Sequence, residues 1–97
     1  MSKYEYKSKN GARPDIYDAK ELVHQYVGEH LDVTDSFMLS DDDIYCVWWC
    51  YILGGWKCLM STTIHDGMYY EVTYNKDANE IYLDAYKKFE NRGYKVG

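Results

Sequence analysis

The sequence predicts an α+β fold, in which an N-terminal helix packs on one face of an antiparallel β-meander of four to five strands. Three observations lead to this class. One segment repeats apolar residues at helical spacing, several later segments have the composition of strands, and short turn-like segments separate those strands. A helix stripe and an apolar sheet face each need a partner, so the two layers should enclose one core.

The predicted helix follows Pro14, which suits a helix entry, and Asp15, whose carboxylate can cap the first turn. It should end near Leu31. A short, weakly alternating strand over 33–39 and a turn at 40–43 should follow. The apolar stripe of the helix recurs at three- and four-residue spacing and comprises Ile16, Ala19, Val23, Tyr26, Val27 and His30.

The longest predicted strand is IYCVWWCYIL, residues 44–53. Gly54-Gly55 then reads as a two-residue hairpin turn into a returning strand over 56–64. The turn HDG leads to a third strand, MYYEVTYN, at 68–75.

The two turns predict a register for these three strands. Pairing across the first turn sets Trp49 opposite Met60 and Tyr51 opposite Cys58, and pairing across the second sets Met60 opposite Val72. Because side chains alternate with a period of two, all these residues share one sheet face. The predicted core face is therefore apolar across three strands and also includes Tyr45, Val47 and Leu53.

Residues 80–91 allow two interpretations, a strand or a helix with Tyr82, Ala85, Tyr86 and Phe89 as its stripe. We favour the strand, because the preceding residues 77–79 are turn-like and β-formers are frequent. The strand register places Glu71 opposite Asp84, and it adds to the core face Ile81, Leu83 and Ala85, opposite Tyr74, Val72 and Tyr70.

Residues 1–13 are rich in lysine and poor in apolar side chains, which predicts a flexible tail before a single domain over 14–97. The tyrosines of this tail, Tyr4 and Tyr6, leave open an extra edge strand.

The 97-residue chain carries a formal charge of −5, and 46% of its residues are hydrophobic. This composition argues against general disorder, and the negative charge argues against duplex nucleic acid and anionic membranes. No apolar run reaches the roughly 18 residues of a membrane span, and the N-terminus lacks the pattern of a signal peptide. Three cysteines in apolar surroundings read as reduced thiols, so we expect a cytoplasmic protein.

The strand at 44–53 is apolar on both faces, whereas a half-buried antiparallel strand normally alternates with polar residues. Two explanations stay open: the final segment or the tail covers the second face, or a partner binds it. We favour a partner, either a foreign protein or a second copy of the chain. The predicted contact residues are Ile44, Trp48, Ile52, Leu59, Tyr69, Tyr82 and Tyr86, with the acidic run Asp41, Asp42 and Asp43.

Catalytic and metal chemistry find little support in the sequence. Cys46 and Cys50 would lie roughly 13 Å apart along one strand, too far for one zinc ion. Glu71 and Asp84 can in principle hold a hard cation, but a solvated acidic rim is the favoured interpretation. There is no phosphate-binding loop, dinucleotide fingerprint or nucleophile elbow. We therefore predict no enzymatic activity, metal or cofactor.

Twelve tyrosines provide an alternative function. Tyr69, Tyr82 and Tyr86 can stack on a small ligand, a nucleotide or a single-stranded nucleic acid. The sparse basic residues of the domain argue against the nucleic acid.

The run VWWCYILGGWKCLMSTTIHDGMYYEVTYNKDANEIYLDAYKKFEN resembles a family of short uncharacterised proteins carried by phages and prophages of Gram-positive bacteria. The resemblance covers residues 15–92 and includes EHLDVTDSF. It implies an accessory phage gene, a class in which small acidic proteins often bind and inhibit host factors, and it carries over no catalytic residues. We expect a non-enzymatic protein that inhibits a host protein, such as a nucleic-acid-handling defence factor, in the manner of an anti-CRISPR protein.

Overall fold

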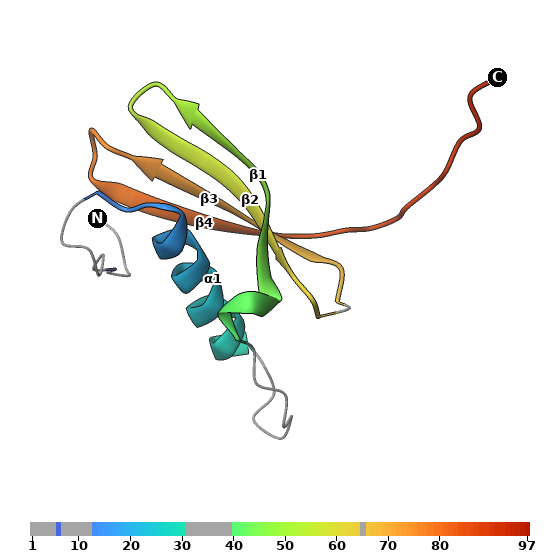
Figure 1. The fold of residues 1–97 in the computed structure, drawn as a ribbon, viewed down its shortest axis with the longest axis horizontal. Helices are drawn as coiled ribbons and strands as arrows, with labels where there is room; N and C mark the ends of the chain where they lie inside the picture. The colour runs from blue at the N-terminus through green and yellow to red at the C-terminus, as the bar shows by residue number, and fades with distance from the viewer. Residues whose placement is uncertain (1–5, 7–12, 31–39, 65) are drawn as a thin grey trace.

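The computed structural model describes residues 6, 13–30, 40–64 and 66–97, and it has the predicted α+β architecture. The strands form one antiparallel sheet in the meander order β1-β2-β3-β4. Figure 1 shows the helix lying across one face of this sheet. The elements are α1 (Ile16–His30), a 3₁₀ turn η1 (Asp41–Asp43), β1 (Ile44–Ile52), β2 (Gly55–Thr62), β3 (Met68–Asn75) and β4 (Glu80–Lys87).

Helix α1 begins with the cap that the sequence predicts. Asp15 Oδ1 accepts hydrogen bonds from the backbone N–H groups of Tyr17 at 3.0 Å and Asp18 at 3.3 Å. Asp18 Oδ2 in turn accepts the backbone N–H of Asp15 at 2.7 Å. This reciprocal capping satisfies N–H groups that have no partner within a helix. The helix is described as far as His30, and the expected end near Leu31 lies at the limit of the described residues. No helix of the described residues is long and apolar enough to cross a membrane.

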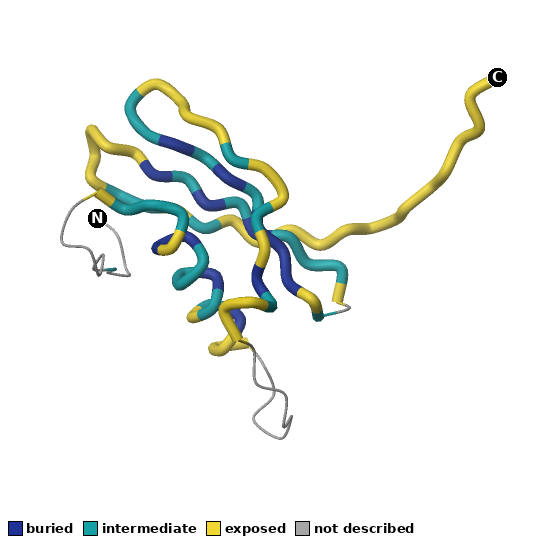
Figure 2. Tube along the Cα trace, viewed as in Figure 1, coloured by how far each residue is buried: buried dark blue, intermediate teal, exposed yellow. Residues whose placement is uncertain are grey.

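The core lies between α1 and the sheet face toward it, which we call the core face. Ala19, Val23 and Val27 from the helix are buried against this face. Burying an apolar side chain of this size contributes about 1.5–3 kcal/mol relative to exposure. Figure 2 shows that buried residues concentrate in α1 and the central strands β2 and β3. Those strands contribute Trp56, Cys58, Met60, Tyr70, Val72 and Tyr74.

The β3–β4 pair confirms the strand interpretation of residues 80–87. Val72 lies opposite Leu83 and Glu71 opposite Asp84, as predicted. The turn between the strands contains Asn79, which has a positive φ of 51°. Asparagine is one of the few residues that adopt this conformation readily, so the local sequence suits the turn.

The first hairpin turn differs from the prediction by one residue. Leu53 and Gly54 form the turn, and Gly55 already belongs to β2. Trp49 therefore lies opposite Cys58, two residues away from its predicted position. A displacement of two residues preserves the alternation, so this part of β1 keeps its predicted face. The β2–β3 register is displaced by two residues as well.

Strand β1 contains a bulge that the sequence did not predict. The pairing shifts between Cys46, which lies opposite Met60, and Trp48, which lies opposite Leu59. Val47 is the extra residue. A single extra residue reverses the side-chain alternation on either side of it.

The bulge corrects the predicted position of the first residues of β1. Ile44 was expected on the second face, but only 1% of it is exposed, and it belongs to the core cluster. Tyr45 and Val47, expected in the core, are exposed instead. Ile44 therefore supports the core and is not available to a partner in this structure.

The C-terminal segment, residues 88–97, continues beyond β4 and projects away from the sheet (Figure 1). Its large apolar side chains, Phe89, Tyr94 and Val96, are exposed. Of the two explanations for the second sheet face, the structure does not support the one in which this final segment covers it.

Most of the predicted tail and the predicted strand at 33–39 lie outside the described residues, as does His65. Tyr6 is described, and it contacts α1. Its hydroxyl donates to Asp18 Oδ1 at 2.8 Å and to Glu21 Oε2 at 3.2 Å. Partial burial, together with these carboxylates, raises the pKa of Tyr6. Tyr6 thus lies against the helix and does not add to a sheet edge.

Candidate functional site

The sheet face that points away from α1, which we call the back face, contains most of the predicted partner-binding residues. Cross-strand pairing arranges its side chains in rows from β1 to β4. These rows are Tyr45–Ser61–Tyr69–Tyr86, Trp48–Leu59–Glu71–Asp84, Cys50–Lys57–Thr73–Tyr82 and Ile52–Gly55–Asn75–Glu80.

Large apolar or aromatic side chains occur in each of these rows. Trp48 is 39% exposed and Ile52 is 41% exposed, and both are large apolar residues of the edge strand β1. Tyr82 and Tyr86 on β4 are also exposed. The register places the half-buried Leu59 next to Trp48 and the half-buried Tyr69 next to Tyr86. The back-face patch is defined as Tyr45, Trp48, Ile52, Leu59, Tyr69, Tyr82 and Tyr86.

The described part of the chain provides no second layer over the back face. Helix α1 lies on the core side, and the C-terminal segment points away from the sheet. Figure 2 shows exposed residues along β1, β4 and the C-terminal segment. Exposed apolar surfaces of this kind are characteristic of interaction sites.

Charged residues cross the middle of the back face. Glu71 and Asp84 lie directly opposite each other, as predicted, and Lys57 Nζ is 3.5 Å from Glu71 Oε1. The ion pair offsets part of the like-charge repulsion. No group of three or more potential metal ligands occurs among the described residues. The patch is therefore apolar with a partly neutralised acidic strip.

The predicted acidic run Asp41–Asp43 forms η1 at the edge of the sheet and is partly engaged within the fold. Asp43 accepts hydrogen bonds from Ser40 N at 2.9 Å, Ser40 Oγ at 3.0 Å and Thr63 Oγ1 at 3.1 Å. The hydrogen bonds from Ser40 lower the pKa of Asp43. Asp41 Oδ1 lies 3.2 Å from His24 Nδ1 on α1. Asp43 thus stabilises the turn, whereas Asp41 and Asp42 are exposed.

The cysteines are unsuited to nucleophilic chemistry where they are buried. All three thiols are free. Burial raises the pKa of Cys58 to about 12, and desolvation also raises the pKa of Cys46. Because the thiolate is the reactive form, neither residue is activated at neutral pH.

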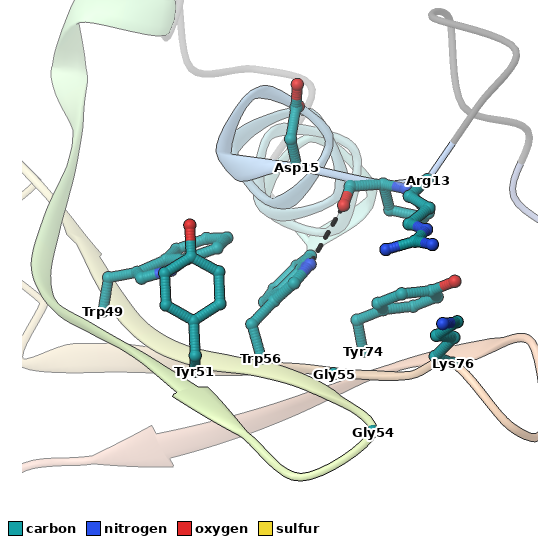
Figure 3. Close-up of a pocket in the computed structure, with 10 residues that line it drawn as sticks. Arg13, Asp15, Trp49, Tyr51, Gly54, Gly55, Trp56, Tyr74 and Lys76 are labelled. Carbon is teal, nitrogen blue, oxygen red and sulfur yellow. Dashed lines mark hydrogen bonds between the residues drawn. The ribbon is translucent and has the colours of Figure 1, made fainter.

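Sequence reasoning missed a pocket on the core face, at the end of the sheet near the first hairpin. It is formed by Trp56 and Tyr74 together with the cations Arg13 and Lys76 (Figure 3). The sequence signal that could have indicated this pocket was the group of aromatic residues that lies beyond the N-terminal end of α1. The two cations are far apart in the sequence and come close to each other only when the chain folds.

Comparison with known proteins identifies a family for this chain but assigns it no activity. No curated protein and no solved structure matches it. A family model described as a family of unknown function, DUF6275, matches residues 16–96, which include α1, all four strands and most of the C-terminal segment. The chain belongs to this uncharacterised family.

Proposed function

We propose that this member of a family of unknown function is a non-enzymatic protein-binding domain that contacts its partner through the back-face patch. One observation carries the proposal. The patch exposes large side chains such as Trp48, and no described element of the chain covers it. Aromatic side chains supply much of the binding energy at protein interfaces, because they bury a large area at low entropic cost.

The charge distribution narrows the chemistry of the partner. Residues 14–87 contain 14 acidic and 4 basic side chains, a formal charge of −10, whereas the flanking segments 1–13 and 88–97 carry +3 and +2. Glu71 and Asp84 lie within the back face, and the exposed Asp41 and Asp42 add negative charge at the sheet edge, where Asp41 pairs with His24 of α1. The complementary partner presents apolar surface together with basic side chains that face this acidic strip.

A nucleic-acid-handling protein has such a surface. An acidic domain can compete with nucleic acid for a basic channel and so inhibit the protein that uses it. The resemblance to proteins carried by phages and prophages supports a bacterial host protein as the target, reached in the cytoplasm, with a defence factor as the class we propose.

The proposal is tested by partner capture with two matched variants on the same strand. The immobilised protein is exposed to lysate from infected or prophage-bearing cells, and captured proteins are identified by mass spectrometry. Trp48→Asp changes the back face, whereas Tyr51→Asp changes a side chain on the core side that is 82% exposed. The identified partner is then purified and titrated. We expect Trp48→Asp to weaken binding about 30-fold or more and Tyr51→Asp to leave it unchanged.

Circular dichroism and thermal melting establish that each variant is folded. Ile52→Asp provides a second back-face variant should Trp48→Asp destabilise the domain. Equal binding by wild type and folded back-face variants would contradict the proposal. If sedimentation instead shows a dimer that either back-face variant dissociates, the partner is a second copy of the chain.

A second candidate function uses the tyrosines of the same face. Tyr69 lies directly opposite Tyr86, and Tyr82 follows on the same side of β4. These rings can stack on a small ligand or on a single-stranded nucleic acid. Titration with a labelled oligonucleotide tests this function, since strand binding should be saturable and should weaken with salt.

A further inference from the structure

The pocket at the hairpin end of the core face is built on a continuous set of aromatic rings. Trp49 and Trp56 stack with ring centroids 4.4 Å apart and an interplanar angle of 27°. Tyr51 meets Trp49 edge-on at 6.0 Å, and Tyr74 lies 5.8 Å from Trp56. Trp56 is fixed by a hydrogen bond of 2.9 Å from its Nε1 to the carbonyl oxygen of Pro14. Trp49, Trp56 and Tyr74 are therefore packed against one another before any ligand arrives, whereas Tyr51 is largely exposed.

Two cations line the same pocket. Figure 3 shows the side chains of Arg13 and Lys76 next to the Tyr74 ring, on the side away from Tyr51. The pocket has a volume of about 430 Å³, within the range of about 300–1,000 Å³ that is usual for small-molecule sites. Aromatic walls with cations at one end suit a ligand that is itself a ring joined to an anion.

Gly54 and Gly55 line the pocket, and Gly55 allows strands β2 and β3 to approach closely. A Cβ on Gly55 would overlap the backbone carbonyl of Tyr74, so a side chain cannot be accommodated there without moving β2 from β3. Gly54 has a φ of +82°, a conformation that favours glycine.

The acidic residue of the pocket is already engaged. Asp15 Oδ1 accepts the backbone N–H groups of Tyr17 and Asp18 at the start of α1. Figure 3 shows Asp15 pointing away from the rings. Its charge is also partly offset by the positive end of the helix. Among the lining residues Arg13 and Lys76 outnumber this carboxylate, which favours an anion, and the Asp77 carboxylate lies beside Gly54 just outside the lining.

The exposed C-terminal segment of this chain is a poor occupant for the pocket. Its Phe89 and Tyr94 rings would suit the aromatic wall, but the segment has a formal charge of +2. Docking it beside two cations would bring like charges together. A separate anionic ligand fits both features.

We propose that this pocket binds a planar aromatic ring bearing one anionic group. A nucleoside monophosphate has this chemistry, and so does the aromatic C-terminal residue of a peptide. The site lies on the opposite sheet face from the back-face patch, so the proposal stands whether or not the patch binds a protein.

Tryptophan fluorescence of the full chain reports on binding directly. A Trp48→Phe background leaves Trp49 and Trp56 as the remaining tryptophans, and both line the pocket. The titrants are AMP, adenosine, inorganic phosphate and N-acetylphenylalanine. We expect saturable quenching by AMP with a dissociation constant below about 1 mM. Adenosine and phosphate should each bind more weakly than AMP. Tighter binding of N-acetylphenylalanine than of AMP would identify a peptide terminus as the source of the ligand.

Matched variants separate the ring and charge contributions. Tyr51→Ala should weaken AMP binding about tenfold through lost stacking; Tyr17→Ala, at a tyrosine on α1 that is 73% exposed, should not change it. Lys76→Gln should weaken AMP binding about threefold and leave adenosine unaffected. Lys87→Gln, which removes the same charge at another exposed strand end, is its control.

Three results would overturn the proposal. They are the lack of saturable binding by both AMP and N-acetylphenylalanine, equal affinities for AMP and adenosine, and equal effects of Lys76→Gln and Lys87→Gln. Calorimetric titration of the wild-type chain provides a readout that does not depend on fluorescence.

Discussion

The core face and the back face of the sheet are made from the same strands and from similar residues, yet their side chains differ in burial. On the core face, Trp56 is buried and its indole N–H donates to Pro14. On the back face, Trp48 remains 39% exposed. The difference comes from the layer that α1 adds to one side and from the position of the strands, since Trp56 lies on the central strand β2 and Trp48 on the edge strand β1. A strand's apolar content therefore sets how much surface can be buried, and the number of layers decides which side chains are buried.

The largest difference in stability between the two faces is expected at two isoleucines of β1. Ile44→Asp should destabilise the protein by more than about 4 kcal/mol, because it places an unpaired charge in the core. Ile52→Asp should cost less than about 1 kcal/mol, because that side chain is already hydrated on the back face. Urea unfolding followed by circular dichroism measures both. Similar losses would show that the two residues do not lie on different faces.

A smaller effect is expected for two adjacent residues of β2. Met60→Ala should cost about 3 kcal/mol by leaving a cavity in the core, whereas Leu59→Ala should cost about 1 kcal/mol from its half-buried position. Met60 is fully buried in the core cluster, and Leu59 lies on the back face. The same unfolding assay applies, and a larger loss for Leu59→Ala would indicate that the back face is covered.

The least perturbing test labels the thiols without changing stability. Cys50 is exposed on the back face, so a thiol reagent at neutral pH should modify it first. Cys58 should react only after unfolding, because it is buried and its pKa is raised to about 12. Mass spectrometry of the labelled peptides gives the order. Early modification of Cys58 would show that the core face opens in the folded protein.

The sequence was sufficient for the features with strong local signals. Asp15 and the apolar spacing after it predicted the cap of α1 and its stripe, except that His30, which was included in the stripe, is exposed. The alternation around Val72 and Leu83 predicted the β3–β4 register, because a turn-like segment separates two strands of clear alternation. Each of these depends on residues close together in the chain.

The features that escaped prediction depend on signals that the sequence lacks. β1 is apolar on both faces, so its pattern cannot reveal the reversal at Val47. Gly54 and Gly55 both suit a turn, which left the hairpin position ambiguous by one residue. The pocket cations, Arg13 and Lys76, are brought together only when α1 and the sheet assemble.

The same ambiguity explains the mixed outcome for the candidate site. The faces of Trp48 and Ile52 followed from alternation after the bulge, and both residues lie where the sequence placed them. Ile44 precedes the bulge and falls on the other side. Asp43 looked like a free surface charge but is engaged by Ser40 and Thr63.

The bulge at Val47 also affects how relatives of this chain are to be aligned. Inserting or deleting one residue between Cys46 and Trp48 would move the side chains at the start of β1 to the opposite face of the sheet, although the neighbouring residues stayed the same. A single-residue gap in this short stretch thus has a structural meaning that a similar gap in an exposed loop would not have. Before the bulge the even-numbered residues of β1 lie on the core face, and after it the odd-numbered residues do. Polar substitutions should therefore be tolerated better at odd-numbered positions before the bulge and at even-numbered positions after it.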